Sequence, residues 1–191
     1  CYNVHYILNL HIIMNLSATV NLILSILTVV AQLIVVYILV VLISRTYSHQ
    51  LFGKPFAFIK THGILVAFVV ALVAMLGSLT FSNILGYEPC KLCWYQRIFM
   101  YPQVFLLGLA LVLKEKTIVP YAILLAVIGG TISAYHFIVQ LGIFPAPCSV
   151  SGYSVSCAKV FVLQFGYITI PLMALTASVL IILSLMHHKR V

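Results

Sequence analysis

Between two long apolar segments the chain reads Pro89-Cys90-Lys91-Leu92-Cys93-Trp94-Tyr95-Gln96-Arg97. The Cys-x-x-Cys pair of Cys90 and Cys93 can close a small disulfide ring, and a nearby positive charge makes such sulfurs reactive by stabilising the thiolate. If a helix opens at Trp94, residues four apart share a face, so Arg97 is expected to point back toward Cys93. This stretch predicts a redox site, with a structural disulfide or half of a zinc site as the alternatives.

The composition predicts a membrane protein rather than a soluble domain. Of the 191 residues, 64% are hydrophobic and 6% are charged, and apolar runs long enough to span a bilayer recur along the chain. The net charge of +8 raises the question of a nucleic-acid partner. The Lys and Arg residues are scattered in short loops, without a basic stripe or an aromatic stacking platform, so nucleic acid is excluded.

Five apolar segments are expected to cross the membrane. They are residues 16–43, 64–85, 94–113, 118–140 and 164–186. Most Lys and Arg residues lie in the connections at 44–60 and 114–116 or near the end of the chain at 187–190, which predicts that these parts are cytoplasmic. The N-terminus and both cysteine-bearing connections are then expected on the extracytoplasmic face.

The predicted fold is all-α, a polytopic membrane protein in which two helical hairpins form a four-helix transmembrane bundle. We expect two parts. Residues 1–60 hold an additional N-terminal transmembrane helix and its cytoplasmic loop, and residues 61–191 hold the four-helix core. The chain starts at Cys1 without a Met, which indicates a fragment or a processed product, so Cys1 carries little weight in the functional argument.

A second cysteine pair, Cys148 and Cys157, stands in the connection that precedes the last span. Two pairs on one oxidising face allow thiol–disulfide exchange between loops, because a thiolate of one pair can attack the disulfide of the other. The electrons then need an acceptor. The chain has no Gly-rich nucleotide fingerprint and no soluble domain that would hold a flavin, so a lipid-soluble quinone is the remaining two-electron carrier.

Two polar side chains in the apolar segments are candidates for the quinone site. An arginine within a span costs roughly 2.5–3.5 kcal/mol on insertion scales and is usually kept for a function. Arg97 is therefore expected to bind a quinone oxygen and to stabilise the Cys93 thiolate, unless it snorkels to nearby headgroups. His136 has a quinone or proton role as one interpretation and a plain interhelical hydrogen bond as the other.

The residues at 90–97 closely resemble the signature of the bacterial disulfide bond formation protein B family, nearer its BdbC-like branch through the Trp-Tyr-Gln-Arg-Ile run. The resemblance covers about residues 63–186, including the second cysteine loop and the start of the last span at 165–171. It implies a protein-disulfide-forming thiol:quinone oxidoreductase of the bacterial inner membrane. Such an enzyme reoxidises an extracytoplasmic thioredoxin-like thiol oxidase of the DsbA or BdbD kind and reduces ubiquinone or menaquinone.

The resemblance also implies roles for individual residues. Cys90 and Cys93 would form the quinone-proximal pair, with Cys93 contacting the quinone and Arg97 assisting. Cys148 and Cys157 would form the pair that meets the partner, with Cys148 taking the mixed disulfide. No metal ion is expected. The family core has four spans, so residues 1–60 depart from its pattern.

Other classes of protein remain as alternatives. A vitamin K epoxide reductase-like protein also joins helices, cysteine pairs and a quinone, but its Cys-x-x-Cys is expected late in the bundle. A small non-redox transporter or assembly protein would hold the four cysteines as structural disulfides or as a zinc site. The eight residues between Cys148 and Cys157 suit zinc poorly. A transporter should also carry paired intramembrane charges or broken-helix repeats, which the chain lacks.

Overall fold

The structure, a computed structural model, describes residues 4–43, 53–115, 117–144 and 156–187. Within these residues it is all-helical, apart from one isolated bridge between Gln164 and Ile168. In chain order the helices are α1 (Val4–Ile43), α2 (Gly53–Leu79), the π-helix η1 (Thr80–Ile84), α3 (Lys91–Leu113), α4 (Val119–Gln140) and α5 (Ile170–Met186).

The helices have the length and composition of membrane spans. Four stretches in the described ranges are long and apolar enough to cross a bilayer: Met14–Ile43, Thr61–Ile84, Lys91–Leu113 and Val119–Gln140. Helix α5 is apolar but shorter, at 17 residues, or about 26 Å. A helix satisfies its own backbone hydrogen bonds, as lipid requires. The prediction of an all-α polytopic membrane protein is confirmed.

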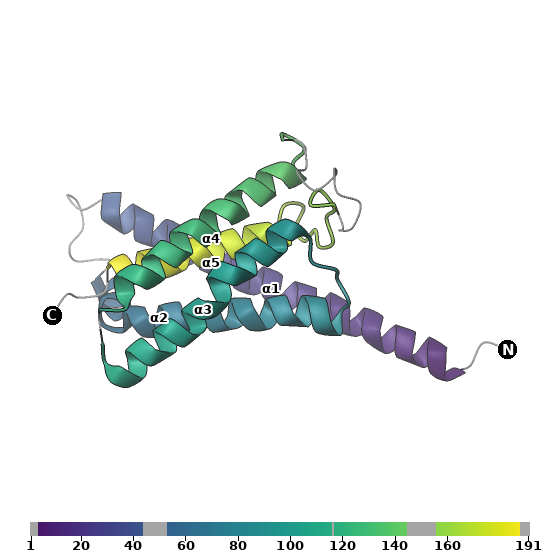
Figure 1. The fold of residues 1–191 in the computed structure, drawn as a ribbon, viewed down its shortest axis with the longest axis horizontal. Coiled ribbons are helices and arrows are strands. Elements are labelled where there is room, and N and C mark those ends of the chain that lie inside the picture. Colours follow the sequence, from purple (N-terminus) through teal and green to yellow (C-terminus); the bar gives the residue numbers. More distant parts are fainter. Residues whose placement is uncertain (1–3, 44–52, 116, 145–155, 188–191) are drawn as a thin grey trace.

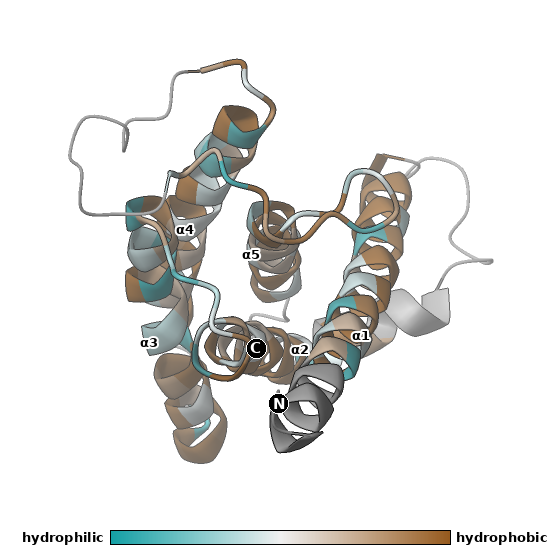
Figure 2. Ribbon diagram, turned by 90° about the vertical axis from the view of Figure 1, so that its right-hand side faces the viewer, coloured by the Kyte–Doolittle hydropathy of each residue, from teal (hydrophilic) through white to brown (hydrophobic). Residues whose placement is uncertain are grey.

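Helices α2 to α5 form a four-helix bundle, and α1 packs against its outside (Figure 1). Helix α5 contacts α1, α2 and α4, while α3 contacts α2 and α4. Seen along the bundle, α3 and α4 lie on one side, α1 lies on the other, and α5 lies between them (Figure 2). Small residues allow close packing: a Cβ at Gly130 of α4 would lie only 3.2 Å from the Ser178 Cβ of α5.

Both described cysteine regions lie at the same end of the bundle. The start of α1, the α2–α3 connection that carries Cys90 and the segment that leads into α5 share this end (Figure 1). The α3–α4 connection and the C-terminal end of α5 lie at the opposite end. This is the arrangement that exchange between the two cysteine loops requires.

The start of α3 differs from the prediction. The helix begins at Lys91, with Cys90 as its N-cap, rather than at Trp94. The Trp94 amide donates to the Cys90 carbonyl at 3.1 Å, so the helical hydrogen bonds already include the Cys-x-x-Cys pair. Cys93 therefore lies in the first turn of the helix, where the partial positive charge of a helix N-terminus favours thiolates.

The last helix starts later than predicted, at Ile170 rather than at Gln164. Phe165 and Gly166 have φ angles of +52° and +78°, which no right-handed helix accommodates. They form a turn closed by hydrogen bonds between Gln164 and Ile168. The earlier start was predicted because residues 164–186 are apolar overall, although Gly166 is a residue typical of turns. Helices α1 and α2, in contrast, start earlier than the spans predicted from residues 16 and 64.

Candidate functional site

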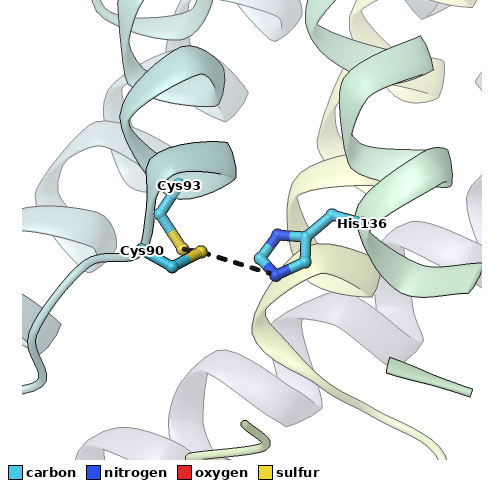
Figure 3. A group of neighbouring side chains, drawn as sticks. All are labelled: Cys90, Cys93 and His136. Atoms are coloured by element: carbon cyan, nitrogen blue, oxygen red, sulfur yellow. Dashed lines mark hydrogen bonds between the residues drawn. The ribbon is translucent and has the colours of Figure 1, made fainter. Parts of the chain in front are cut away.

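Cys90 and Cys93 lie side by side as free thiols. Their sulfur atoms are 3.3 Å apart and share a thiol hydrogen bond (Figure 3). Cys90 is buried, at 3% exposure, while Cys93 is partly exposed. The pair is thus in its dithiol form, close enough to form a disulfide with a small shift of either side chain.

His136 of the neighbouring helix α4 faces this pair (Figure 3). The ring is buried, at 2% exposure. Its Nε2 lies 3.7 Å from Cys90 Sγ and 3.1 Å from the Cys157 carbonyl oxygen. A carbonyl oxygen only accepts, so Nε2 carries the hydrogen. Nδ1 lies 3.1 Å from Gln96 Nε2 and accepts from that amide, so the ring N–H is on Nε2, toward Cys90 and the Cys157 carbonyl.

The hydrogen bonds that favour a thiolate converge on Cys90. The hydrogen bond from the Cys93 thiol lowers the pKa of Cys90 below its ordinary value, and the His136 hydrogen bond acts in the same direction, while burial opposes both. The sequence had pointed to Arg97 as the group that stabilises a thiolate. It named no hydrogen-bond donor for Cys90.

We expect Cys90 of the reduced protein to be alkylated at pH values where an ordinary cysteine no longer reacts. Because its folded-state pKa is lowered, the reactive thiolate is lost only as the pH falls through that lower value. Cys93→Ala removes the donor and should shift the profile to higher pH, whereas Cys93→Ser keeps a hydroxyl donor and should shift it less. Mass spectrometry of the Cys90 peptide after iodoacetamide treatment measures this. Identical profiles for the three proteins would contradict the assignment.

The second cysteine region packs directly against the first. Cys157 is disulfide-bonded and buried, at 1% exposure. It shares a buried cluster with Cys90, Leu92 and Val139. Its predicted partner, Cys148, lies outside the described residues. The Cys157 carbonyl oxygen and the Cys90 sulfur both contact Nε2 of His136.

Arg97 lies between α3 and α2. Its Nε donates to Ser78 Oγ at 3.0 Å, and its Nη2 donates to the Ser78 carbonyl oxygen at 3.1 Å. The Tyr101 hydroxyl donates to the same Ser78 Oγ at 3.1 Å, and the guanidinium carbon lies 5.3 Å from the centre of the Trp94 ring. These contacts fix the side chain within the bundle. Sequence reasoning did not single out Ser78, because a serine in an apolar run gives no sign of its partner.

A cavity of about 320 Å³ opens beside Cys93. Glu88, Cys93, Gln96 and Arg97 line it around the start of α3, and mostly apolar side chains of α1, α2 and α5 line much of the rest, with Thr28 and Thr176 among them. Its volume and its mostly apolar wall, with a few polar groups, are typical of a small-molecule site. The site thus has two sides: Cys93 lies at the cavity, and Cys90 lies against the Cys157 region.

The donor atoms of Cys90, Cys93 and His136 all lie within 4.8 Å of one another. Two sulfurs and an imidazole nitrogen are ligands that zinc accepts, but a structural zinc site needs a fourth ligand. The His136 Nε2–H donates to the Cys157 carbonyl oxygen, so this nitrogen is not free to bind a metal ion. The arrangement therefore fits a dithiol with a hydrogen-bonding imidazole better than it fits a metal centre.

Comparisons with known proteins match the part of the chain that holds the four-helix bundle. The family described as "Disulfide bond formation protein DsbB" matches residues 60–187. Disulfide bond formation protein C of Bacillus subtilis (strain 168) is 48% identical over 122 residues, which cover 61% of this chain and 85% of that protein. Probable disulfide formation protein C 1 of Bacillus anthracis is 44% identical over 117 residues, which cover 61% and 84%. No solved structure gives a significant match.

Proposed function

The chain belongs to the disulfide bond formation protein DsbB family, which makes it a membrane disulfide oxidoreductase, and on this basis we propose that it carries electrons from an extracytoplasmic thiol oxidase to a membrane quinone. One observation carries the proposal. Cys93 and Arg97 line an apolar cavity, while Cys90, one helical turn away, packs against Cys157. The Cys-x-x-Cys pair thus has one sulfur toward a lipid-soluble acceptor and one toward the second cysteine loop.

The exchange between the two pairs is written as thiol–disulfide chemistry. A reduced partner opens the Cys148–Cys157 disulfide and leaves as a disulfide. The Cys157 thiolate then attacks Cys90 of an oxidised Cys90–Cys93 pair, so a Cys90–Cys157 bond forms and Cys93 leaves as a thiolate. The Cys148 thiolate attacks Cys157 in turn, which re-forms the Cys148–Cys157 disulfide and releases Cys90 as a thiolate, so the Cys90–Cys93 pair is left reduced. The His136 N–H, 3.7 Å from Cys90 Sγ, is suited to stabilise negative charge on the Cys90 sulfur.

A quinone, when bound, accepts the two electrons and two protons that this pair releases on reoxidation. The residues present fit such a group. The cavity wall is apolar, and Arg97 and Gln96 supply hydrogen-bond donors at its Cys93 end. Arg97 holds its guanidinium there through two bonds to Ser78, so its charge is available without a change of rotamer.

We further propose that residues 61–191 form the oxidoreductase core in a bacterial inner membrane, with residues 1–60 as an addition. The partner would be a thioredoxin-like oxidase of the DsbA or BdbD kind. Lys114 lies at the end of the bundle away from the cysteines, which supports an extracytoplasmic position for both pairs. Labelling of the reduced protein with a membrane-impermeant maleimide tests this position. Labelling of Cys90 and Cys93 only from the cytoplasmic side would refute it.

Purified protein mixed with a quinone and a reduced thioredoxin-like oxidase tests the function itself. We expect a fall in quinone absorbance matched by loss of partner thiols, two thiols for each quinone. A chelator should not change the rate, because no metal ion takes part in the proposed path. Partner oxidation that does not depend on quinone would overturn the proposal.

Arg97→Met should raise the apparent KM for quinone by about tenfold or more, because a hydrogen bond from a charged group is worth about 1.5–3 kcal/mol. Tyr101→Phe is the matched control, since it removes a hydroxyl that binds Ser78 and keeps both the Arg97 charge and the aromatic ring that lines the cavity. We expect near-normal quinone kinetics for that control. Normal kinetics in Arg97→Met would instead give the arginine a purely structural role.

A further inference from the structure

Helix α1, which precedes the part of the chain matched by the family, carries a stripe of polar residues. Asn21, Ser25, Thr28 and Gln32 follow one another at steps of three or four residues and so lie on one helix face. Ser25 has no exposed surface and Thr28 has 7%. Polar side chains in a span usually face other protein rather than lipid. The stripe therefore marks the face by which α1 packs against the bundle.

Specific contacts attach this face to α2 and to the α5 region. Gln32 Nε2 donates to Thr176 Oγ1 at 3.4 Å, and Gln32 Oε1 accepts from the Tyr167 hydroxyl at 3.0 Å. Nearer the start of α1, Leu24 packs closely against Gly77 of α2. A Cβ at position 77 would lie only 3.2 Å from Leu24 Cδ1. Helix α1 thus packs against the bundle in a defined position.

Helix α1 forms one wall of the cavity beside Cys93. Leu24, Leu27, Thr28 and Ala31 all line it. Along α5 the lining extends from Ile170 to Leu180, about 15 Å at the helical rise of 1.5 Å per residue. The cavity is therefore elongated along the helices, with charged and amide side chains at the Cys93 end and mostly apolar side chains along its length, where Thr28 and Thr176 are the polar exceptions.

We infer that α1 completes the binding site for the isoprenoid tail of the quinone, an inference that rests on the proposed function. The shape and chemistry of the cavity match a molecule with a redox-active head and a long apolar tail. The head end holds Cys93 and Arg97, and the apolar length leads away from them between α1, α2 and α5. A phospholipid acyl chain would fill the apolar part but has no polar group that would interact with Cys93 and Arg97 at the other end.

The test measures binding to the full-length protein in nanodiscs, with Trp94 as the reporter. This is the single Trp of the chain, and it stacks near Arg97 at the head end, so a bound quinone head should quench its fluorescence. The probes are menaquinone and menadione, which has the same head group without the tail. Ala31→Phe places a ring in the cavity, and Leu33→Phe, at a site with 65% exposure on the same helix, is the matched control.

We expect Ala31→Phe to raise the Kd for menaquinone by about tenfold, the loss of contact with about two methylene groups, and to leave the Kd for menadione unchanged. Leu33→Phe should change neither. Leu27→Ala removes apolar contacts from the cavity wall without adding bulk, and it should raise the menaquinone Kd by about threefold. This second variant keeps the test valid if Ala31→Phe does not fold. Equal effects on both probes, or none in either wall variant, would overturn the inference while quinone binding itself stands. Failure of both probes to quench Trp94 in the unmodified protein would overturn the proposed function as well.

Discussion

Replacing Cys93 by serine is expected to abolish quinone reduction, with a fall of at least about a thousandfold in kcat. Cys93 is the sulfur that lines the cavity, and without it Cys90 has no neighbour with which to re-form a disulfide. Without a Cys90–Cys93 disulfide the Cys157 thiolate has no bond to attack, so the electrons stay on the Cys148–Cys157 pair. The fold should persist, because serine is close to cysteine in volume and Cys93 is only partly buried.

The same variant should still oxidise partner once. The Cys148–Cys157 disulfide does not depend on Cys93, so about one equivalent of partner thiols should be consumed before the reaction stops. Quinone absorbance and partner thiol titration measure the two halves of the reaction. Cys1→Ser, at the cysteine outside both pairs, is the matched control and should turn over normally. Normal turnover of Cys93→Ser would show that the sulfur at the cavity is not the one that reduces quinone.

The membrane spans could be predicted because each rests on a long run of apolar residues, which lipid allows only as helix. Their ends could not, because local turns decide them. The left-handed φ angles of Phe165 and Gly166 delay the start of α5 to Ile170, within a stretch that was predicted as one span because it is apolar overall. Cys90 as the N-cap of α3 likewise follows from backbone geometry that the Cys-x-x-Cys spacing does not specify.

The sequence identified the cysteine pair and named Arg97 and His136 as candidate neighbours, but it did not predict which atoms these side chains contact. His136 lies on a different helix, and only the rotation of α4 about its axis brings its ring to Cys90. Ser78 and Gln96, which bind Arg97 and His136, depend on the same helix rotations. For α1 a signal was available: the polar stripe through Ser25 and Gln32 distinguishes its packed face from its lipid face.

Cys157→Ser is expected to trap the partner as a mixed disulfide with Cys148. The variant is mixed with the oxidised partner: the Cys148 thiolate attacks the partner's disulfide, one partner sulfur leaves as a thiolate, and the other stays bonded to Cys148. Serine at position 157 supplies no second thiol from the same pair to resolve that bond. Turnover with quinone should fall to the background rate. Non-reducing gel electrophoresis, with mass spectrometry of the linked peptides, detects the covalent complex, and a reductant should release it.

The packing of Cys157 explains why a second loss should accompany the trap. Cys157 lies in the buried cluster that contains Cys90, and it is the sulfur through which electrons would reach the Cys-x-x-Cys pair. In Cys157→Ser the Cys90–Cys93 pair should therefore stay oxidised when reduced partner is added, as alkylation and mass spectrometry would show. Cys148→Ser provides the matched comparison, because it should form no complex with the partner at all. If Cys148→Ser still oxidises partner catalytically, or if Cys157→Ser passes electrons to Cys90 and Cys93 at the normal rate, then the order of electron flow from the outer pair to the inner pair is wrong.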